Sequence, residues 1–178
     1  VQICYRDSTP QRDICIINIA HRTTNLTPSL CDTWSTKSVK PDFVKSNCYR
    51  IVAGKTLDPT KCDNIQDNNS NKVACYQTLA RDLKDPSLCE KIPLTSADAL
   101  DDKNFCYFLL AEETLNPDYC DKIRPISYRS RLSRSDCYFR VATQKPDIKL
   151  CENIIDDPST TISQEKCREW AQVRSEQN

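Results

Sequence analysis

A phrase of 18 residues with a cysteine near each end recurs along this chain, and it limits the possible folds more than any other feature. CYRIVAGKTLDPTKCDNI begins at Cys48, CYQTLARDLKDPSLCEKI at Cys75 and CYFLLAEETLNPDYCDKI at Cys106. Looser copies begin at Cys15 and Cys137, and a truncated sixth copy begins at Cys167. A period near 30 residues predicts a stacked array of small units instead of one large core.

The first half of each phrase has the spacing of a helix that buries one face. The position after the first cysteine is apolar or aromatic, the fourth position is aliphatic and the fifth is always alanine. These positions lie on one side of a helix, and a small alanine there lets a neighbouring helix approach closely. We therefore expect core packing, with a row of ligand-stacking side chains as the alternative. The alanines are Ala20, Ala53, Ala80, Ala111 and Ala142.

The middle of the phrase predicts where this helix ends and a short second helix begins. Asp58-Pro59, Asp85-Pro86 and Asn116-Pro117 each combine a capping side chain with a proline that suits the first helical position. The second cysteine follows three residues later. An acidic residue comes next and is expected to complement the helix dipole, with a row of ligating acids as the alternative. These acids are Asp32, Asp63, Glu90, Asp121 and Glu152, and the apolar residues that follow them by two positions are Trp34, Ile65, Ile92, Ile123 and Ile154.

The single glycine, Gly54, indicates that turns with positive φ are nearly absent. It also excludes the glycine-rich loops that bind phosphate.

The twelve cysteines predict six disulfides and an oxidising compartment. Pairing within a phrase would join Cys48 to Cys62, but nine residues of helix from Cys48 to Leu57 rise roughly 13 Å, and a disulfide tolerates only about 4.4 to 6.8 Å between Cα atoms. Pairing across the following loop avoids this difficulty. The predicted pairs are Cys4–Cys15, Cys31–Cys48, Cys62–Cys75, Cys89–Cys106, Cys120–Cys137 and Cys151–Cys167.

Several features predict an extracellular or cell-surface location. The chain has no methionine, which predicts a processed mature form or a fragment, and its longest apolar runs, residues 14–20 and 105–111, are shorter than the roughly 20 residues of a spanning helix. No membrane span is therefore expected. Asn25 and Asn68 begin triplets that accept N-linked glycans in secreted proteins.

Charge and composition disfavour several functions. The chain has 25 basic and 25 acidic residues, so no net charge attracts it to nucleic acid. His21 is the one histidine and no Cys-x-x-Cys motif is present, so we expect no metal, no cofactor and no enzymatic activity. A basic stretch at residues 124–137 contains Arg129, Arg131 and Arg134, which are candidates for binding an acidic partner; a solvated basic loop is the alternative.

The pattern CYxxLAxxxxDPxxC resembles the second helix of a tetratricopeptide-type repeat. Its period differs from the 34 residues of that family, its cysteine pairs are foreign to the family, and the Trp-Leu-Gly helix is absent. The resemblance, which extends to Sel1-like arrays, implies an all-α, right-handed solenoid of about five short helix-turn-helix repeats, here stapled by disulfides. The expected parts are an N-terminal cap (residues 1–14), repeats at 15–47, 48–74, 75–105, 106–136 and 137–166, and a C-terminal capping helix (167–178).

What the resemblance implies about function is a scaffold for protein interactions, because such arrays present extended surfaces. We expect a non-catalytic secreted or cell-surface protein that binds protein partners or self-associates as a structural subunit of an extracellular assembly. The alternative is an extracellular module that binds a carbohydrate or small molecule.

Overall fold

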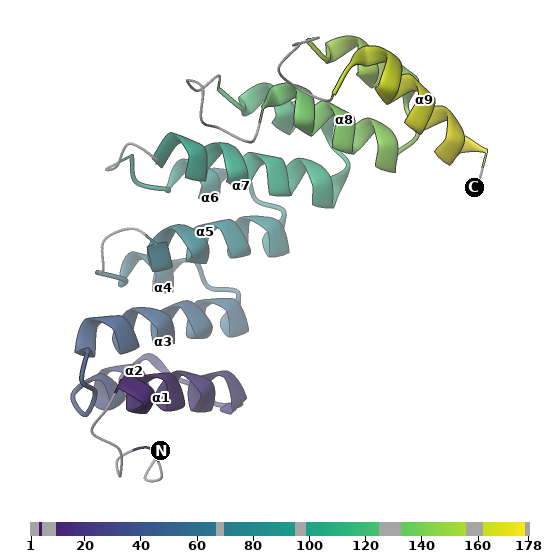
Figure 1. Ribbon diagram of the computed structural model, residues 1–178. Helices are drawn as coiled ribbons and strands as arrows, with labels where there is room; N and C mark the ends of the chain where they lie inside the picture. The colour runs from purple at the N-terminus through teal and green to yellow at the C-terminus, as the bar shows by residue number, and fades with distance from the viewer. Residues whose placement is uncertain are drawn as a thin grey trace. The chain divides into compact units, whose positions relative to one another are not determined.

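The computed structural model describes residue 4 and residues 10–66, 70–94, 99–124, 133–155 and 162–176, and these contain helices and no β-strand (Figure 1). The predicted all-α class is confirmed. Long and short helices alternate along the chain. In order they are α1 (Pro10–Arg22), α2 (Pro28–Ser35), α3 (Pro41–Thr56), α4 (Thr60–Asp63), α5 (Ser70–Leu83), α6 (Ser87–Glu90), α7 (Ala99–Thr114), η2 (Pro117–Lys122), α8 (Arg134–Gln144), η3 (Ile148–Asn153) and α9 (Gln164–Ser175).

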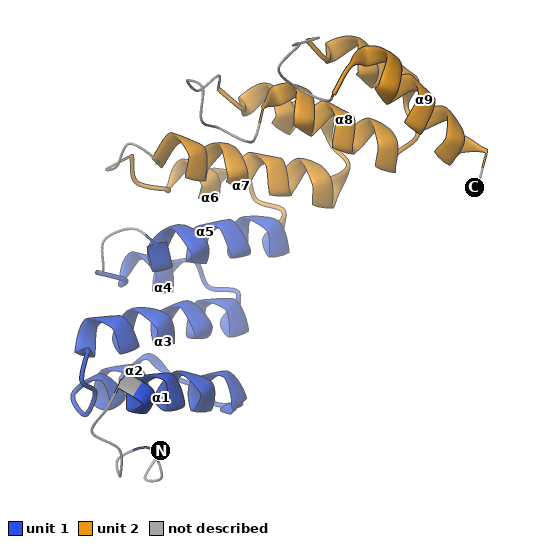
Figure 2. Ribbon diagram, in the orientation of Figure 1, with its two compact units in different colours: residues 1–83 blue, residues 84–178 orange. Residues whose placement is uncertain are grey.

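The chain forms two compact units, Val1–Leu83 and Lys84–Asn178 (Figure 2). In the first unit, α3 packs against α1, α2 and α5. In the second, α8 packs against α7, α9 and the two short helices η2 and η3. Each long helix therefore contacts its neighbours in sequence, as expected for an array of repeated helix pairs.

The long helices begin before the cysteine from which the sequence repeat was counted. Helix α3 begins at Pro41, seven residues before Cys48, and α8 begins at Arg134, three residues before Cys137. Helix α1 begins at Pro10, within the segment assigned to an N-terminal cap, and α9 begins at Gln164. The cysteine lies inside the helix because its partner is in the preceding short helix.

The short second helices differ in type along the chain. Helix α2 has eight residues and α4 and α6 have four each, whereas η2 and η3 are 3₁₀ helices of six residues. The tighter 3₁₀ form is common in such short connecting pieces. None of these helices is long enough to be stable by itself.

The capping role of the Asp-Pro and Asn-Pro pairs is confirmed. The side chain of Asp58 accepts a hydrogen bond from the Thr60 N–H at 3.0 Å, and that of Asp85 accepts one from the Ser87 N–H at 2.9 Å. Asn116 does the same for the N–H of Asp118 at 3.0 Å. Each side chain satisfies a donor that the beginning of a helix leaves unpaired.

The predicted core residues are buried. The five repeated alanines have 0% of their surface exposed, and the four aliphatic residues Val52, Leu79, Leu110 and Val141 are buried next to them. Ile19 is half-buried and is the exception in this series. The five apolar residues of the short helices, Trp34, Ile65, Ile92, Ile123 and Ile154, are also buried.

The expectation that positive φ is nearly absent is wrong. Leu57, Lys84 and Leu115 have φ of 51°, 55° and 51°, each directly before an Asp-Pro or Asn-Pro pair. The left-handed conformation ends the long helix and reverses the chain. It costs roughly 1 to 2 kcal/mol for residues other than glycine. Gly54, by contrast, lies within α3.

Replacing Lys84 by glycine is expected to stabilise the protein. The substitution removes the left-handed penalty at an exposed side chain, less the conformational entropy that glycine adds to the unfolded chain, for a net gain of about 0.5 to 1 kcal/mol. Urea denaturation measures this change. Lys145→Gly is the matched control, because Lys145 ends α8 with φ of −96°. An equal gain in both variants would show that the left-handed backbone is not the cause.

Polar side chains two residues before the first cysteine of a phrase hold the loops. Buried Asp13 accepts hydrogen bonds from the N–H groups of Val39 and Lys40, directly before α3. Buried Asn104 donates to the carbonyl of Arg124 and accepts from its N–H. These contacts fix the chain where it enters or leaves a helix.

Lys55, in the last turn of α3, caps the end of α1. Its Nζ donates to the carbonyl oxygens of Ala20 at 3.1 Å, His21 at 2.8 Å and Thr23 at 2.6 Å. A cation at this place satisfies unpaired carbonyls and complements the negative end of the helix dipole.

Lys55→Met is expected to lower the free energy of unfolding by about 2 kcal/mol, because the methionine keeps the apolar stem but loses three charge-assisted hydrogen bonds. Thermal or urea unfolding measures the loss. Lys91→Met, at an exposed lysine outside this cap, is expected to change stability by less than about 0.5 kcal/mol. Similar losses in both variants would contradict the capping role.

Candidate functional site

Six disulfides join the cysteine pairs that the spacing predicts, so the pairing across the loop is confirmed. Their Cα–Cα distances are 5.5 to 5.8 Å, and no cysteine is free. Five of the six bridges join a short second helix to the long helix that follows it. The cysteines are consequently covalent staples and not nucleophiles or metal ligands.

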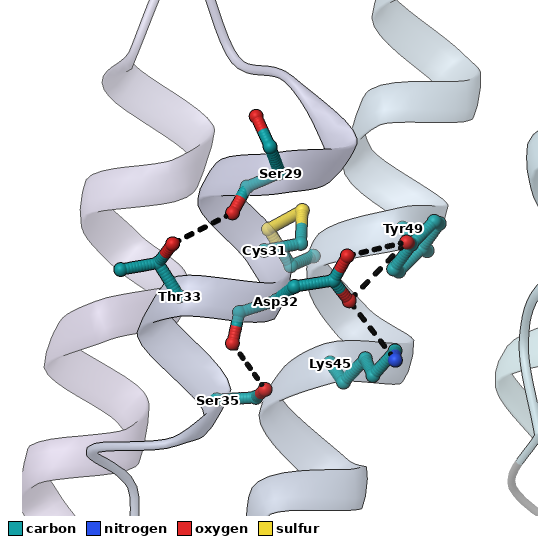
Figure 3. Close-up of polar contacts among 8 residues, drawn as sticks. Ser29, Cys31, Asp32, Thr33, Ser35, Lys45 and Tyr49 are labelled. Carbon is teal, nitrogen blue, oxygen red and sulfur yellow. Dashed lines mark hydrogen bonds and ion pairs between the residues drawn. A yellow bond between two sulfur atoms is a disulfide. The ribbon is translucent and has the colours of Figure 1, made fainter.

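Beside four of these bridges the structure places a contact that we call the tyrosine–carboxylate clasp. The residue after the first cysteine of the pair is acidic, and the residue after the second is a tyrosine whose hydroxyl donates to that carboxylate. Tyr49 donates to Asp32 at 3.2 and 3.3 Å (Figure 3) and Tyr138 to Asp121 at 2.9 Å. The four pairs are Tyr49–Asp32, Tyr76–Asp63, Tyr107–Glu90 and Tyr138–Asp121.

A basic side chain three residues before the second cysteine completes the arrangement. Lys45 Nζ lies 2.9 Å from Asp32 Oδ1, as Figure 3 shows, and Lys103 Nζ lies 2.5 Å from Glu90 Oε2. Arg134 Nη1 is 3.9 Å from Asp121 Oδ1. In the remaining clasp, Lys72 donates to the backbone carbonyl of Asp63 at 3.2 Å. Each clasp thus joins an acid, a phenol and a cation around one disulfide.

The clasps shift the proton equilibria of their members. Burial, together with the bond to Asp121, raises the pKa of Tyr138 to about 12. Burial and the adjoining carboxylate also raise the pKa of Tyr49, Tyr76 and Tyr107. Hydrogen bonds from Lys103 and Tyr107 lower the pKa of Glu90. At neutral pH the phenols are therefore protonated donors and their partners are ionised acceptors.

This geometry changes the interpretation of the repeated acids. Their carboxylates hold tyrosines of the following helix, in addition to any interaction with a helix dipole, and they do not form a row of ligating acids. No group of acidic, histidine or cysteine side chains suited to a metal ion occurs among the described residues. The sequence signal for the clasp was present as Cys-acid followed by basic-x-x-Cys-Tyr, but the tyrosines were grouped with the apolar face.

Of the three arginines predicted to bind a partner, Arg129 and Arg131 lie outside the described residues. Arg134 is exposed at the start of α8 and donates to the carbonyls of Asp121 at 3.2 Å and Ile123 at 3.4 Å. Its contacts join α8 to the end of η2. The partner-binding role of the cluster stays a prediction.

The other predicted positions are on the surface. Asn25 is exposed in the turn between α1 and α2, and Asn68 lies outside the described residues. His21 is exposed near the end of α1 and, with Arg50 and Lys55, lines a hollow of about 220 Å³ in the first unit.

The largest hollows listed here lie in the second unit, on either side of Trp170, and we call them together the Trp170 groove. Their volumes are about 470 and 320 Å³. Phe139 and Arg140 of α8 and Trp170 of α9 line both of them. Leu115 and Arg174 complete the apolar and basic lining of the larger hollow, and Ile162 and Lys166 that of the smaller one.

The polar groups of the groove are mostly donors. The carboxylate of Asp136 accepts from the Ser133 N–H at 2.8 Å and its hydroxyl at 2.5 Å, which caps α8. The hydroxyl of Thr143 donates to the carbonyl of Phe139 at 2.8 Å. Glu112, outside the lining, accepts from Gln144 at 3.1 Å and lies 4.0 Å from Arg140. Sequence reasoning missed this groove because its residues occupy variable positions of the repeat.

No protein-family model, no curated protein and no solved structure matches this chain. The similarity to tetratricopeptide-type arrays is therefore carried only by the short motif and the helix pairs. Among the described residues, no helix has the length and apolar character needed to cross a membrane.

Proposed function

We propose that the protein is a non-catalytic interaction scaffold of the extracellular space or cell surface, with the architecture of a tetratricopeptide-like solenoid. The observation that carries this proposal is the Trp170 groove, an aromatic and basic surface on adjoining long helices. Trp170 has 51% of its surface exposed, and tryptophan and arginine are the residues that most often dominate the binding energy of protein interfaces. The repeated acids and tyrosines, by contrast, are bonded to one another within the clasps.

The test uses purified oxidised protein as a labelled probe of the extracellular protein fraction and surface of cells from its source. We expect saturable binding that is competed by unlabelled protein and lost after the probe is reduced and alkylated. Binding that does not saturate, or that survives unfolding of the probe, would contradict the scaffold function. Light scattering on the same preparation separates a binding module from a self-assembling subunit, because only the latter gains mass with concentration.

Six disulfides indicate an oxidising compartment, and secretion is the form of this that we propose. Expression through the secretory pathway of a eukaryotic host is then expected to place a glycan on Asn25, which is exposed in a turn. Intact mass before and after glycosidase treatment measures it. Thr27→Ala should abolish the Asn25 glycan and Thr27→Ser should keep it; an unmodified Asn25 in secreted protein would contradict the prediction.

A further inference from the structure

We propose that the Trp170 groove binds an acidic segment of a partner protein in which carboxylate side chains flank an apolar anchor. This inference rests on the scaffold function and names the partner chemistry of its surface. It is drawn from the apolar and charged groups that line the two hollows.

The apolar part of the groove suits an anchoring side chain. The rings of Phe139 and Trp170 lie with centroids 6.5 Å apart and planes at 57°, a tilted arrangement that aromatic pairs favour. Leu115 adds an apolar wall on one side of Trp170 and Ile162 on the other. Together they provide two hydrophobic recesses separated by one ring, so a partner's apolar side chain can lose its contact with water there.

The charged part requires an anionic partner. Arg140 and Arg174 line the larger hollow, in which no acidic residue takes part. Arg140 and Lys166 line the smaller one, whose single acid, Asp136, is bonded to Ser133. Three cations around one aromatic pair favour carboxylates, which arginine binds through paired hydrogen bonds.

The same inventory disfavours a neutral sugar. Sugar hydroxyls both donate and accept, so a site for them needs acceptors as well as donors. The Asp136 carboxylate and the Thr143 hydroxyl already take part in bonds within α8. A sulfated sugar would satisfy the cations but would leave the recesses beside Leu115 and Ile162 unfilled. An acidic peptide with an apolar side chain satisfies both parts.

The probe is a short synthetic peptide in which Asp and Glu flank a Leu-Phe pair, labelled with fluorescein and followed by anisotropy. We expect it to bind the oxidised protein and to change the emission of the exposed Trp170, whereas the other tryptophan, Trp34, is buried in the first unit. Arg140→Glu and Trp170→Ala should each weaken binding by at least about tenfold. Raising the salt from about 50 to 300 mM should weaken it severalfold.

Three controls make the result specific. Lys149→Glu makes the same change of charge at an exposed lysine of η3, outside the groove, and should leave peptide affinity within about twofold of the parent. The Asn/Gln version of the peptide tests the carboxylates, and maltohexaose and a heparin hexasaccharide test sugars. Unchanged urea midpoints show that the variants remain folded, as expected for exposed side chains.

The inference is overturned if the acidic peptide does not bind, if its amide version binds equally well, or if heparin binds at this groove and the peptide does not. Failure here is distinct from failure of the scaffold function. If the oxidised protein binds cell surfaces saturably, and Trp170→Ala and Arg140→Glu leave that binding unchanged, the scaffold function stands and the groove is not its binding site.

Discussion

Replacing both Cys89 and Cys106 by alanine is expected to lower the free energy of unfolding by about 3 kcal/mol. The bridge closes a loop with a sequence separation of 17, and the chain-entropy relation gives this value for a loop of that length. Alanine is the suitable replacement because both cysteines are fully buried, where a serine hydroxyl would add a cost of its own. Urea denaturation measures the loss.

The physical reason is the shortness of the helix that this bridge holds. Helix α6 has four residues, far fewer than an isolated helix needs in water, so its position depends on the bridge and on burial of Leu88 and Ile92. Hydrogen exchange should accordingly increase most at α6 and at the start of α7. A variant within about 1 kcal/mol of the parent would show that packing alone holds this helix.

Complete reduction should have a larger effect. Six bridges at about 3 kcal/mol each exceed the roughly 5 to 15 kcal/mol by which most domains are stable. We therefore expect the protein, once reduced and alkylated in denaturant, to stay largely unfolded by circular dichroism when the denaturant is removed. Parent protein that is reoxidised under the same conditions should recover its helices. Native helicity in the alkylated chain would refute this account of stability.

The sequence predicts the features that are local or that repeat. The pairing of Cys62 with Cys75 follows from helical rise and bridge length, both of which are fixed by covalent geometry. The caps at Asp58 and Asn116 follow from hydrogen bonding between residues two apart. The burial of Ala111 follows from a face that every unit shares, so one periodic argument locates the core of the whole array.

Features that depend on contacts between helices escaped prediction. The Tyr107 hydroxyl bonds to Glu90, 17 positions earlier, and only the packed arrangement of α6 and α7 shows that they meet. The left-handed backbone of Leu57 was missed because the scarcity of glycine suggested the opposite. The Trp170 groove was missed because Phe139 and Trp170 occupy positions that vary between units and have no common pattern.

The clasps connect these observations to a property of the whole protein. Each clasp lies one residue from a bridge, so the same two helices are joined by a disulfide and by a bond from a buried phenol to a carboxylate. An ionised tyrosine would place a second negative charge beside Asp32, Asp63, Glu90 or Asp121. Such repulsion in a half-buried site favours the unfolded chain, where water solvates both charges.

Stability is therefore expected to fall as the pH rises from about 10 to about 12. An unfolded tyrosine has a pKa near 10, whereas the clasp raises the pKa of Tyr138 to about 12. Between these values the unfolded state releases protons that the folded state keeps, so the free energy of unfolding decreases with pH. Below about pH 10 the contribution of the clasps is fully present. Urea midpoints from about pH 8 to 11.5, measured within minutes to protect the disulfides, test this slope.

Tyr107→Phe identifies the source of the slope. At pH 8 it should cost about 1 kcal/mol for the lost hydrogen bond, and above pH 10 its stability should fall less steeply than that of the parent because one clasp no longer titrates. Tyr119→Phe removes a hydroxyl from η2, outside the clasps, and should leave the contribution of all four in place. If stability did not change up to pH 11.5, or if Tyr107→Phe fell as steeply as the parent, buried phenols would not be what couples the folding of this array to alkaline pH.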